Sequence, residues 1–145
     1  MRRAIMLFDA DCGLCTHAAA WLMRRAAPEQ LRAVPLQVVE VVAANRNDAP
    51  GDDGMAQVRQ KVEGRNLRAT LHLVTADGEF RTGAAAVLHA TRQVPGWRHL
   101  ARLADHRLGH ALLEPAYRVV AANRNRIGRW LGIKQACTVP GATLR

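Results

Sequence analysis

The residues with the clearest chemical potential are two cysteines near the start of the chain. Cys12 and Cys15 are three positions apart, and the polar loop Asp9-Ala10-Asp11 separates them from an apolar run at residues 4–8. A Cys-x-x-Cys pair where a strand passes into a helix is typical of a thiol–disulfide redox site. Residues three apart in a helical turn share a face, so the two sulfurs can close a disulfide. The spacing therefore predicts a pair that cycles between dithiol and disulfide.

The two sulfurs are expected to have different roles. Cys12 would lie at the helix N-terminus, where free backbone N–H groups and the positive end of the helix dipole stabilise a thiolate. The thiolate is the form that attacks a disulfide. We therefore expect Cys12 to attack a substrate disulfide and to form a mixed disulfide. Cys15, one turn further along the helix and more buried, would resolve it.

Two carboxylates accompany the pair. Asp11 is placed to cap the helix, and either Asp9 or Asp11 can accept a proton from Cys15 during resolution. Plain capping and hydrogen bonding within the loop is the alternative for both side chains. As anions they would oppose a thiolate at Cys12, so the sequence does not predict a strongly acidic cysteine.

Metal binding and purely structural cysteines are the alternatives to redox chemistry. A structural zinc site needs four ligands, whereas Cys12 and Cys15 supply two and no second Cys-x-x-Cys or Cys-x-x-His follows. His106 and His110 share a helix face but lack a nearby carboxylate pattern, which favours surface histidines. Cys137 is expected to be an incidental thiol near the end of the chain.

The elements that would position the pair follow an α/β order. Apolar runs and turn signals predict strands at 4–8, 31–39, 70–75 and 79–81, and helices at 13–26, 55–63, 83–93, 97–104 and 110–131. Pro35 interrupts the second strand and marks an edge or a bend, and a polar loop is expected at 43–54. The order β-α-β-(α)-β-β-α favours a mixed sheet covered by helices. The cysteines would follow the carboxyl end of the first strand, where open α/β sheets place their sites.

Length and composition indicate one globular domain. The chain has 145 residues, 49% of them hydrophobic and 23% charged, and three cysteines are too few for a disulfide-dense secreted scaffold. The first apolar run ends at Asp9, too early for a secretory signal. No uncharged apolar run approaches the length of about 18 residues that a membrane span needs. We therefore expect a cytoplasmic protein.

Positive charge gathers in the C-terminal third. The net charge is 21 − 12 = +9; residues 1–91 carry 11 basic and 10 acidic side chains, and residues 92–145 carry 10 basic and 2 acidic ones. A solvated helical face is one interpretation. The other is a contact surface for nucleic acid, anionic lipid headgroups or an acidic partner. The second class of function is therefore a non-catalytic binding module that uses these basic helices.

The last predicted helix also bears on the cysteine site. Its arginines are either solvated, or Asn123, Arg124 or Arg126 lies near the cysteine loop. In the second case the side chain would stabilise a thiolate or an anionic substrate such as glutathione.

The stretch from Leu7 to Cys15, Leu-Phe-Asp-Ala-Asp-Cys-Gly-Leu-Cys, resembles the opening signature of the DCC family of predicted thiol-disulfide oxidoreductases. Ala10 takes the position where the family usually has glycine. The resemblance continues, in family order, at residues 71–78, 82–88 and 117–128. It implies a thioredoxin-like fold with a helical C-terminal extension. Thioredoxin-fold enzymes usually have a cis-proline before the third strand, and residues 66–71 contain none, which argues against a standard groove for polypeptide disulfides.

These observations lead to one set of expectations. A thioredoxin-like core would span residues 1–93, a basic helical extension packed on the same domain would span 94–133, and a flexible tail would span 134–145. Cys12 and Cys15 are the candidate catalytic residues, with Asp9, Asp11 and Arg124 as candidate supporting residues. We expect no metal and no organic cofactor, with reducing equivalents supplied by glutathione or a dithiol protein. The substrate would be a disulfide-containing protein or a small thiol.

Overall fold

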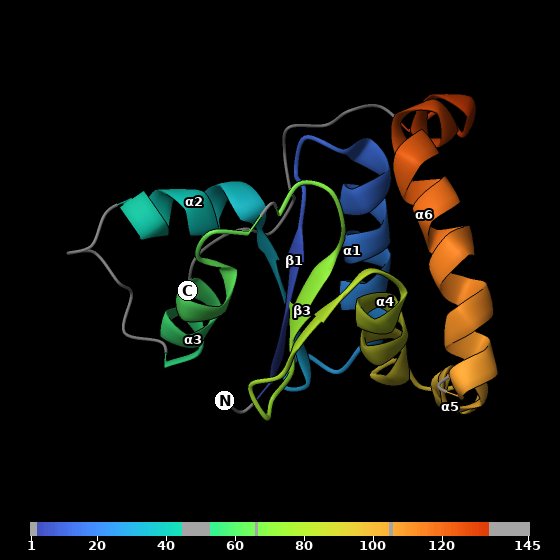
Figure 1. Cartoon of the computed structure of the whole chain (residues 1–145), viewed down its shortest axis with the longest axis horizontal. Helices are drawn as coiled ribbons and strands as arrows, with labels where there is room; N and C mark the ends of the chain where they lie inside the picture. The colour runs from blue at the N-terminus through green and yellow to red at the C-terminus, as the bar shows by residue number, and fades with distance from the viewer. Residues whose placement is uncertain (1–2, 45–52, 66, 105, 134–145) are drawn as a thin grey trace.

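A four-stranded sheet forms the centre of the molecule (Figure 1). The computed structural model describes residues 3–44, 53–65, 67–104 and 106–133. β1 (Ala4–Phe8) pairs in parallel with β2 (Leu31–Pro35) and antiparallel with β3 (His72–Val74), and β3 pairs antiparallel with β4 (Phe80–Thr82). The strand order is β2-β1-β3-β4, so β1 is an inner strand and its carboxyl end leads directly into the cysteine loop.

Helices cover both faces of this sheet. All five residues of β1 are buried, as expected for an apolar run between two layers. Because successive side chains of a strand point to opposite faces, Ala4, Met6 and Phe8 belong to one core cluster and Ile5 and Leu7 to the other. The first cluster includes residues of α1 (Gly13–Arg25) and α4 (Gly83–Arg92), and the second includes residues of α2 (Leu36–Ala44) and α3 (Asp53–Val62).

The C-terminal helices add a further layer. α6 (Arg107–Trp130) packs on α1 and α4, on their side away from the sheet, and α5 (Arg98–Ala104) contacts α4 and α6 (Figure 1). Two side chains of α6 tie it to the core. Tyr117 Oη accepts a hydrogen bond from the N–H of Leu71 at 2.6 Å, and the carboxylate of Glu114 accepts one from the N–H of Ala84 at 3.2 Å.

The β1-α1-β2 unit followed by β3-β4-α4 is a thioredoxin-like fold, here with α6 as a C-terminal helix. The predicted mixed α/β class is confirmed. The predicted strand at 31–39 is wrong beyond Pro35, because α2 begins at Leu36. Leu36 and Val39 are three positions apart and both enter the core, a spacing that suits a helix. Residues 45–52 of the predicted polar loop lie outside the described residues, as does the predicted tail at 134–145 with Cys137.

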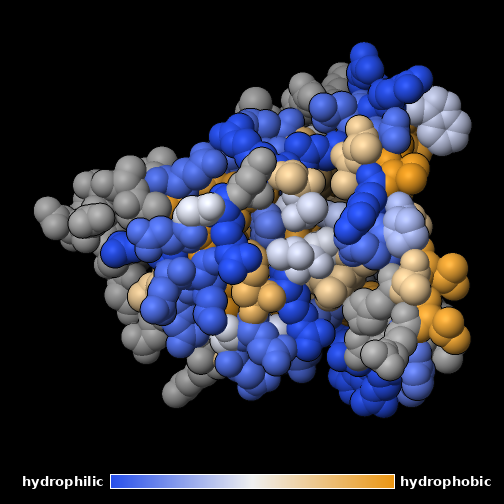
Figure 2. Space-filling model, in the orientation of Figure 1, coloured by the Kyte–Doolittle hydropathy of each residue, from blue (hydrophilic) through white to orange (hydrophobic). Residues whose placement is uncertain are grey.

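The outer face of α6 is exposed. It carries Leu108, Leu112 and Val119, which are 79%, 73% and 63% exposed, together with exposed arginines such as Arg118 and Arg126. Figure 2 shows apolar side chains gathered at the edge of the molecule where α6 runs. Across the part of the chain that is described, no helix has both the length and the apolar character of a membrane span.

Candidate redox site

Cys12 and Cys15 form a disulfide, with their Cα atoms 5.2 Å apart. Cys12 is the N-cap of α1, and its Sγ accepts a hydrogen bond from the N–H of Cys15 at 3.2 Å. The first turn of α1 contains no acidic residue. The helix therefore directs a backbone donor and the positive end of its dipole at the Cys12 sulfur, the environment that stabilises a thiolate.

The burial of the two cysteines is the reverse of the prediction. Cys12 is 2% exposed, whereas Cys15 is half-buried and lines a cavity. The loop explains the difference. Its backbone turns back on itself, with the N–H of Cys12 donating to the carbonyl of Asp9 at 3.2 Å, and Cys12 is drawn into the interior at the end of β1. The first turn of α1 then carries Cys15 to the side that faces α6.

Asp9 organises the loop. Its Oδ1 accepts hydrogen bonds from the N–H of Asp11 and from Nε2 of Gln37, each at 3.1 Å, and its Oδ2 lies 3.4 Å from Nη2 of Arg124. Both carboxylate oxygens are thus occupied by the protein itself. This arrangement corresponds to hydrogen bonding within the loop, one of the two alternatives for Asp9.

Asp11 does not cap α1, so that expectation is wrong. The helix begins at Gly13, so Cys12 occupies the N-cap position, and the Cys12 Sγ accepts the capping hydrogen bond. The Asp11 side chain is exposed, accepts a hydrogen bond from Nε2 of Gln37 at 3.1 Å and lies 3.8 Å from Nη1 of Arg68. Sequence reasoning missed Gln37. The signal for it was its place just after β2, because the carboxyl ends of neighbouring parallel strands meet at one edge of a sheet.

Of the three C-terminal candidates, Arg124 is the one brought to the cysteine loop. Its guanidinium pairs with Asp9, and it lines the same cavity as Cys15. Asn123 instead donates to the carbonyl of Val119 within α6 at 2.8 Å, and Arg126 is exposed.

Sequence reasoning also missed Tyr117, the chain's single tyrosine. Burial raises the pKa of its hydroxyl, which stays protonated at neutral pH.

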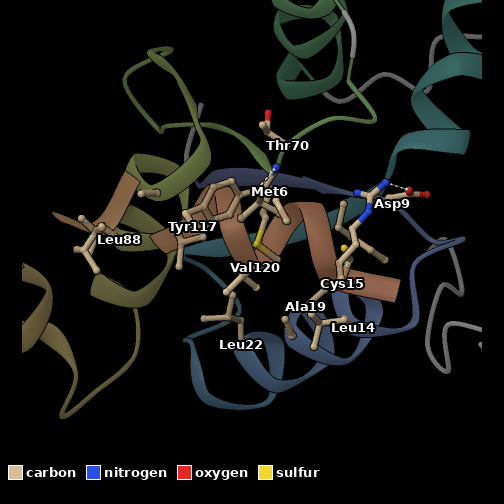
Figure 3. A pocket seen from close by; sticks show the side chains of 18 of the residues that line it. Met6, Asp9, Leu14, Cys15, Ala19, Leu22, Thr70, Leu88, Tyr117 and Val120 are labelled. Atoms are coloured by element: carbon tan, nitrogen blue, oxygen red, sulfur yellow. Dashed lines mark hydrogen bonds and ion pairs between the residues drawn. The ribbon is translucent and has the colours of Figure 1, made fainter. Parts of the chain in front are cut away.

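An apolar cavity of about 430 Å³ lies between the sheet, α1, α4 and α6. Figure 3 shows Cys15 and Asp9 at one end of it and Leu88 towards the other, with Met6, Leu22 and Val120 between them. Of the redox pair, Cys15 therefore faces a largely apolar cavity that is partly open to solvent along α6, where the lining residue Val120 is 45% exposed. No group of three or more His, Cys, Asp or Glu side chains that could hold a metal ion occurs within the described ranges.

A family model described as DCC1-like thiol-disulfide oxidoreductase matches residues 6–130. The match runs from β1 through the cysteine loop to the last residue of α6, so it includes the sheet, the disulfide and the helix that forms one wall of the cavity. No curated protein and no solved structure matches the chain significantly.

Proposed function

The chain belongs to the DCC1-like thiol-disulfide oxidoreductase family, and on that premise we propose that it catalyses thiol–disulfide exchange with Cys12 and Cys15 as the reacting pair. The observation that carries the proposal is the disulfide at the start of α1, with the N–H of Cys15 donating to the Cys12 sulfur. In the reducing direction, the dithiol gives two electrons and two protons to a substrate disulfide. The products are two substrate thiols and the Cys12–Cys15 disulfide.

The two sulfurs differ in what favours their reaction. The helix N-terminus favours negative charge on Cys12, which makes this sulfur the better leaving group when the disulfide opens and the internal nucleophile when it closes. The sequence-based hypothesis also gives Cys12 the first attack on the substrate and leaves resolution to Cys15. The 2% exposure of Cys12 weighs against its sulfur as the first point of contact.

The exchange needs no organic cofactor, because the two electrons pass directly between sulfur atoms. An external thiol or a dithiol protein is sufficient to return the pair to its starting state. Whether the chain reduces or oxidises its substrate depends on the reduction potential of the pair. Potentials of about −270 mV are typical of a reductase and potentials of about −120 mV of an oxidant.

A redox titration tests the proposal. The purified protein is equilibrated in dithiothreitol and glutathione redox buffers of graded potential, free thiols are trapped by alkylation, and masses are read at Cys12, Cys15 and Cys137. We expect one two-electron transition shared by Cys12 and Cys15. The matched control, Cys137→Ser, should keep that transition unchanged. A pair that never closes, or that closes only after a metal is stripped out, would refute the redox function.

A further inference from the structure

The apolar cavity beside Cys15 has the size and lining of a ligand-binding site. Its volume of about 430 Å³ lies in the range of small-molecule sites, which are concave, mostly apolar and fitted with a few polar groups. Its walls combine Met6, Leu22, Val87, Leu113 and Val120 from four different elements. A cavity with so apolar a lining, in which α6 supplies one wall, favours an apolar ligand over water.

The disulfide meets this cavity through one sulfur-bearing residue. Cys15 belongs to the lining, whereas Cys12 does not and is 2% exposed. A molecule inside the cavity therefore reaches Cys15 first. Cys12 is outside the lining, and its Sγ accepts a hydrogen bond from the N–H of Cys15.

We propose that this cavity binds a small uncharged thiol, or its disulfide, with an apolar body, and that exchange takes place at the Cys15 sulfur. The inference rests on the proposed function and specifies its substrate class. It also exchanges the two roles expected from the sequence, because Cys15 becomes the sulfur that carries the mixed disulfide.

The step balances without a further reactant. The ligand thiolate attacks Cys15 Sγ, the Cys12–Cys15 bond breaks, and its electron pair remains on Cys12, where the helix N-terminus stabilises it. The proton lost by the ligand thiol goes to water or to Cys12. A second ligand thiolate then attacks the ligand sulfur of the mixed disulfide, which releases the oxidised ligand and the Cys15 thiolate. The reverse sequence reduces the ligand disulfide.

The charges of the wall favour an uncharged ligand. Among the described lining residues, Asp9 and Arg124 are the charged ones, and they pair with each other at 3.4 Å. An anionic ligand would have to break this pair or leave its own charge in an apolar space, and either change is costly. Glutathione, with two carboxylates and an ammonium group, is therefore a poor fit for this cavity.

The backbone beside the cavity argues against an extended polypeptide. The N–H of Leu71, a lining residue just before β3, donates to Tyr117 Oη at 2.6 Å. It is therefore unavailable for a main-chain hydrogen bond to an extended substrate strand lying beside the segment that precedes β3. α6 takes the place of such a strand.

The test compares two reagents that share a reactive group and differ in charge. Benzyl methanethiosulfonate is apolar and uncharged, and sulfonatoethyl methanethiosulfonate is anionic; both convert a thiolate to a disulfide and release methanesulfinate. Each is reacted with Cys12→Ser in a Cys137→Ser background, which leaves Cys15 as the single thiol, and the rate is read by intact mass. We expect the benzyl-to-sulfonatoethyl rate ratio at Cys15 to exceed that of a free cysteine amide by about tenfold, which corresponds to about 1.4 kcal/mol.

A matched pair of variants links the preference to the cavity. Ala116 is an exposed lining residue of α6, and Ala122 is an exposed residue of the same helix outside the lining. Ala116→Phe should return the ratio to that of free cysteine, and Ala122→Phe should leave it unchanged. Circular dichroism checks that both variants fold.

The outcomes separate the two proposals. A ratio at Cys15 equal to that of free cysteine overturns the cavity site, even if Ala116→Phe does not fold. A larger ratio at Cys12, measured with Cys15→Ser in the same Cys137→Ser background, overturns the assignment of exchange to Cys15. If the wild-type pair still shows its two-electron transition in either case, the proposed function stands. If the pair never closes, the proposed function fails whatever the reagents show.

Discussion

Gly83 is the position where one added methyl group should weaken the attachment of α6. Its φ is +61°, a conformation that costs an L-residue about 1–2 kcal/mol. A Cβ there would also lie 3.0 Å from a carboxylate oxygen of Glu114. That oxygen belongs to a flexible side chain and can move away, but it then gives up the hydrogen bond from the N–H of Ala84, worth about 1 kcal/mol.

Gly83→Ala should therefore destabilise the protein by about 2–3 kcal/mol, which lowers Tm by about 8 °C for a chain of this size. Gly64→Ala is the matched control. Gly64 has a φ of +74°, and no heavy atom lies within 4 Å of the position that a Cβ would occupy. Gly64→Ala therefore introduces the backbone strain without a new side-chain contact. The control should lower Tm by about 4 °C.

A double-mutant cycle with Glu114→Ala isolates the contact. In that background Gly83→Ala should retain only its backbone cost, which gives a coupling of about 1 kcal/mol by urea unfolding. Zero coupling, together with equal losses for the variants at Gly83 and Gly64, would refute the role assigned to Glu114.

Three further predictions concern single side chains. Tyr117→Phe should cost about 1–2 kcal/mol in urea unfolding, because the N–H of Leu71 loses its acceptor; an unchanged midpoint would contradict this. Burial lowers the pKa of His72, so the unfolded chain binds its proton more readily; stability should be full above about pH 6.5 and fall as the pH drops through the folded-state pKa. His72→Gln should flatten that slope, and a slope equal to that of the wild type would argue against it. Asp9→Asn should cost about 1 kcal/mol, below the value for a fully buried ion pair because Arg124 is 25% exposed, and thermal unfolding with no change in Tm would count against the pairing.

The sequence predicted those features that depend on neighbours along the chain. Three local features were predicted: the apolar run at β1, the Cys-x-x-Cys pair and the start of α1. Each is specified within about a dozen residues. Pro35 was interpreted as a break within a strand, whereas it ends β2 and α2 follows at once. A short apolar run such as Leu36 to Val39 is compatible with either a strand or a helix. The helix is adopted because it places Leu36 and Val39 in the core cluster that also contains residues of β1.

The sequence did not predict what depends on packing between distant segments. The surroundings of Cys15 depend on α6, whose residues lie about a hundred positions away and form one wall of the cavity that Cys15 lines. Arg124 could be proposed as a neighbour of the cysteine loop from its charge, but its pairing with Asp9 required the fold. Tyr117 and Glu114 gave no local signal, because they accept hydrogen bonds from backbone N–H groups far along the chain, those of Leu71 just before β3 and of Ala84 in α4.

The disulfide joins residues only three positions apart. The entropy that a cross-link removes from the unfolded chain grows with the loop it closes, so this short loop contributes about 2 kcal/mol, compared with almost 5 kcal/mol for a loop of 100 residues. The two hydrophobic core clusters contain neither cysteine, so the burial of their side chains does not depend on the cross-link itself. In the exchange proposed above, opening the bond therefore removes only about 2 kcal/mol of stabilisation, and the residues of the two core clusters are not among those that react.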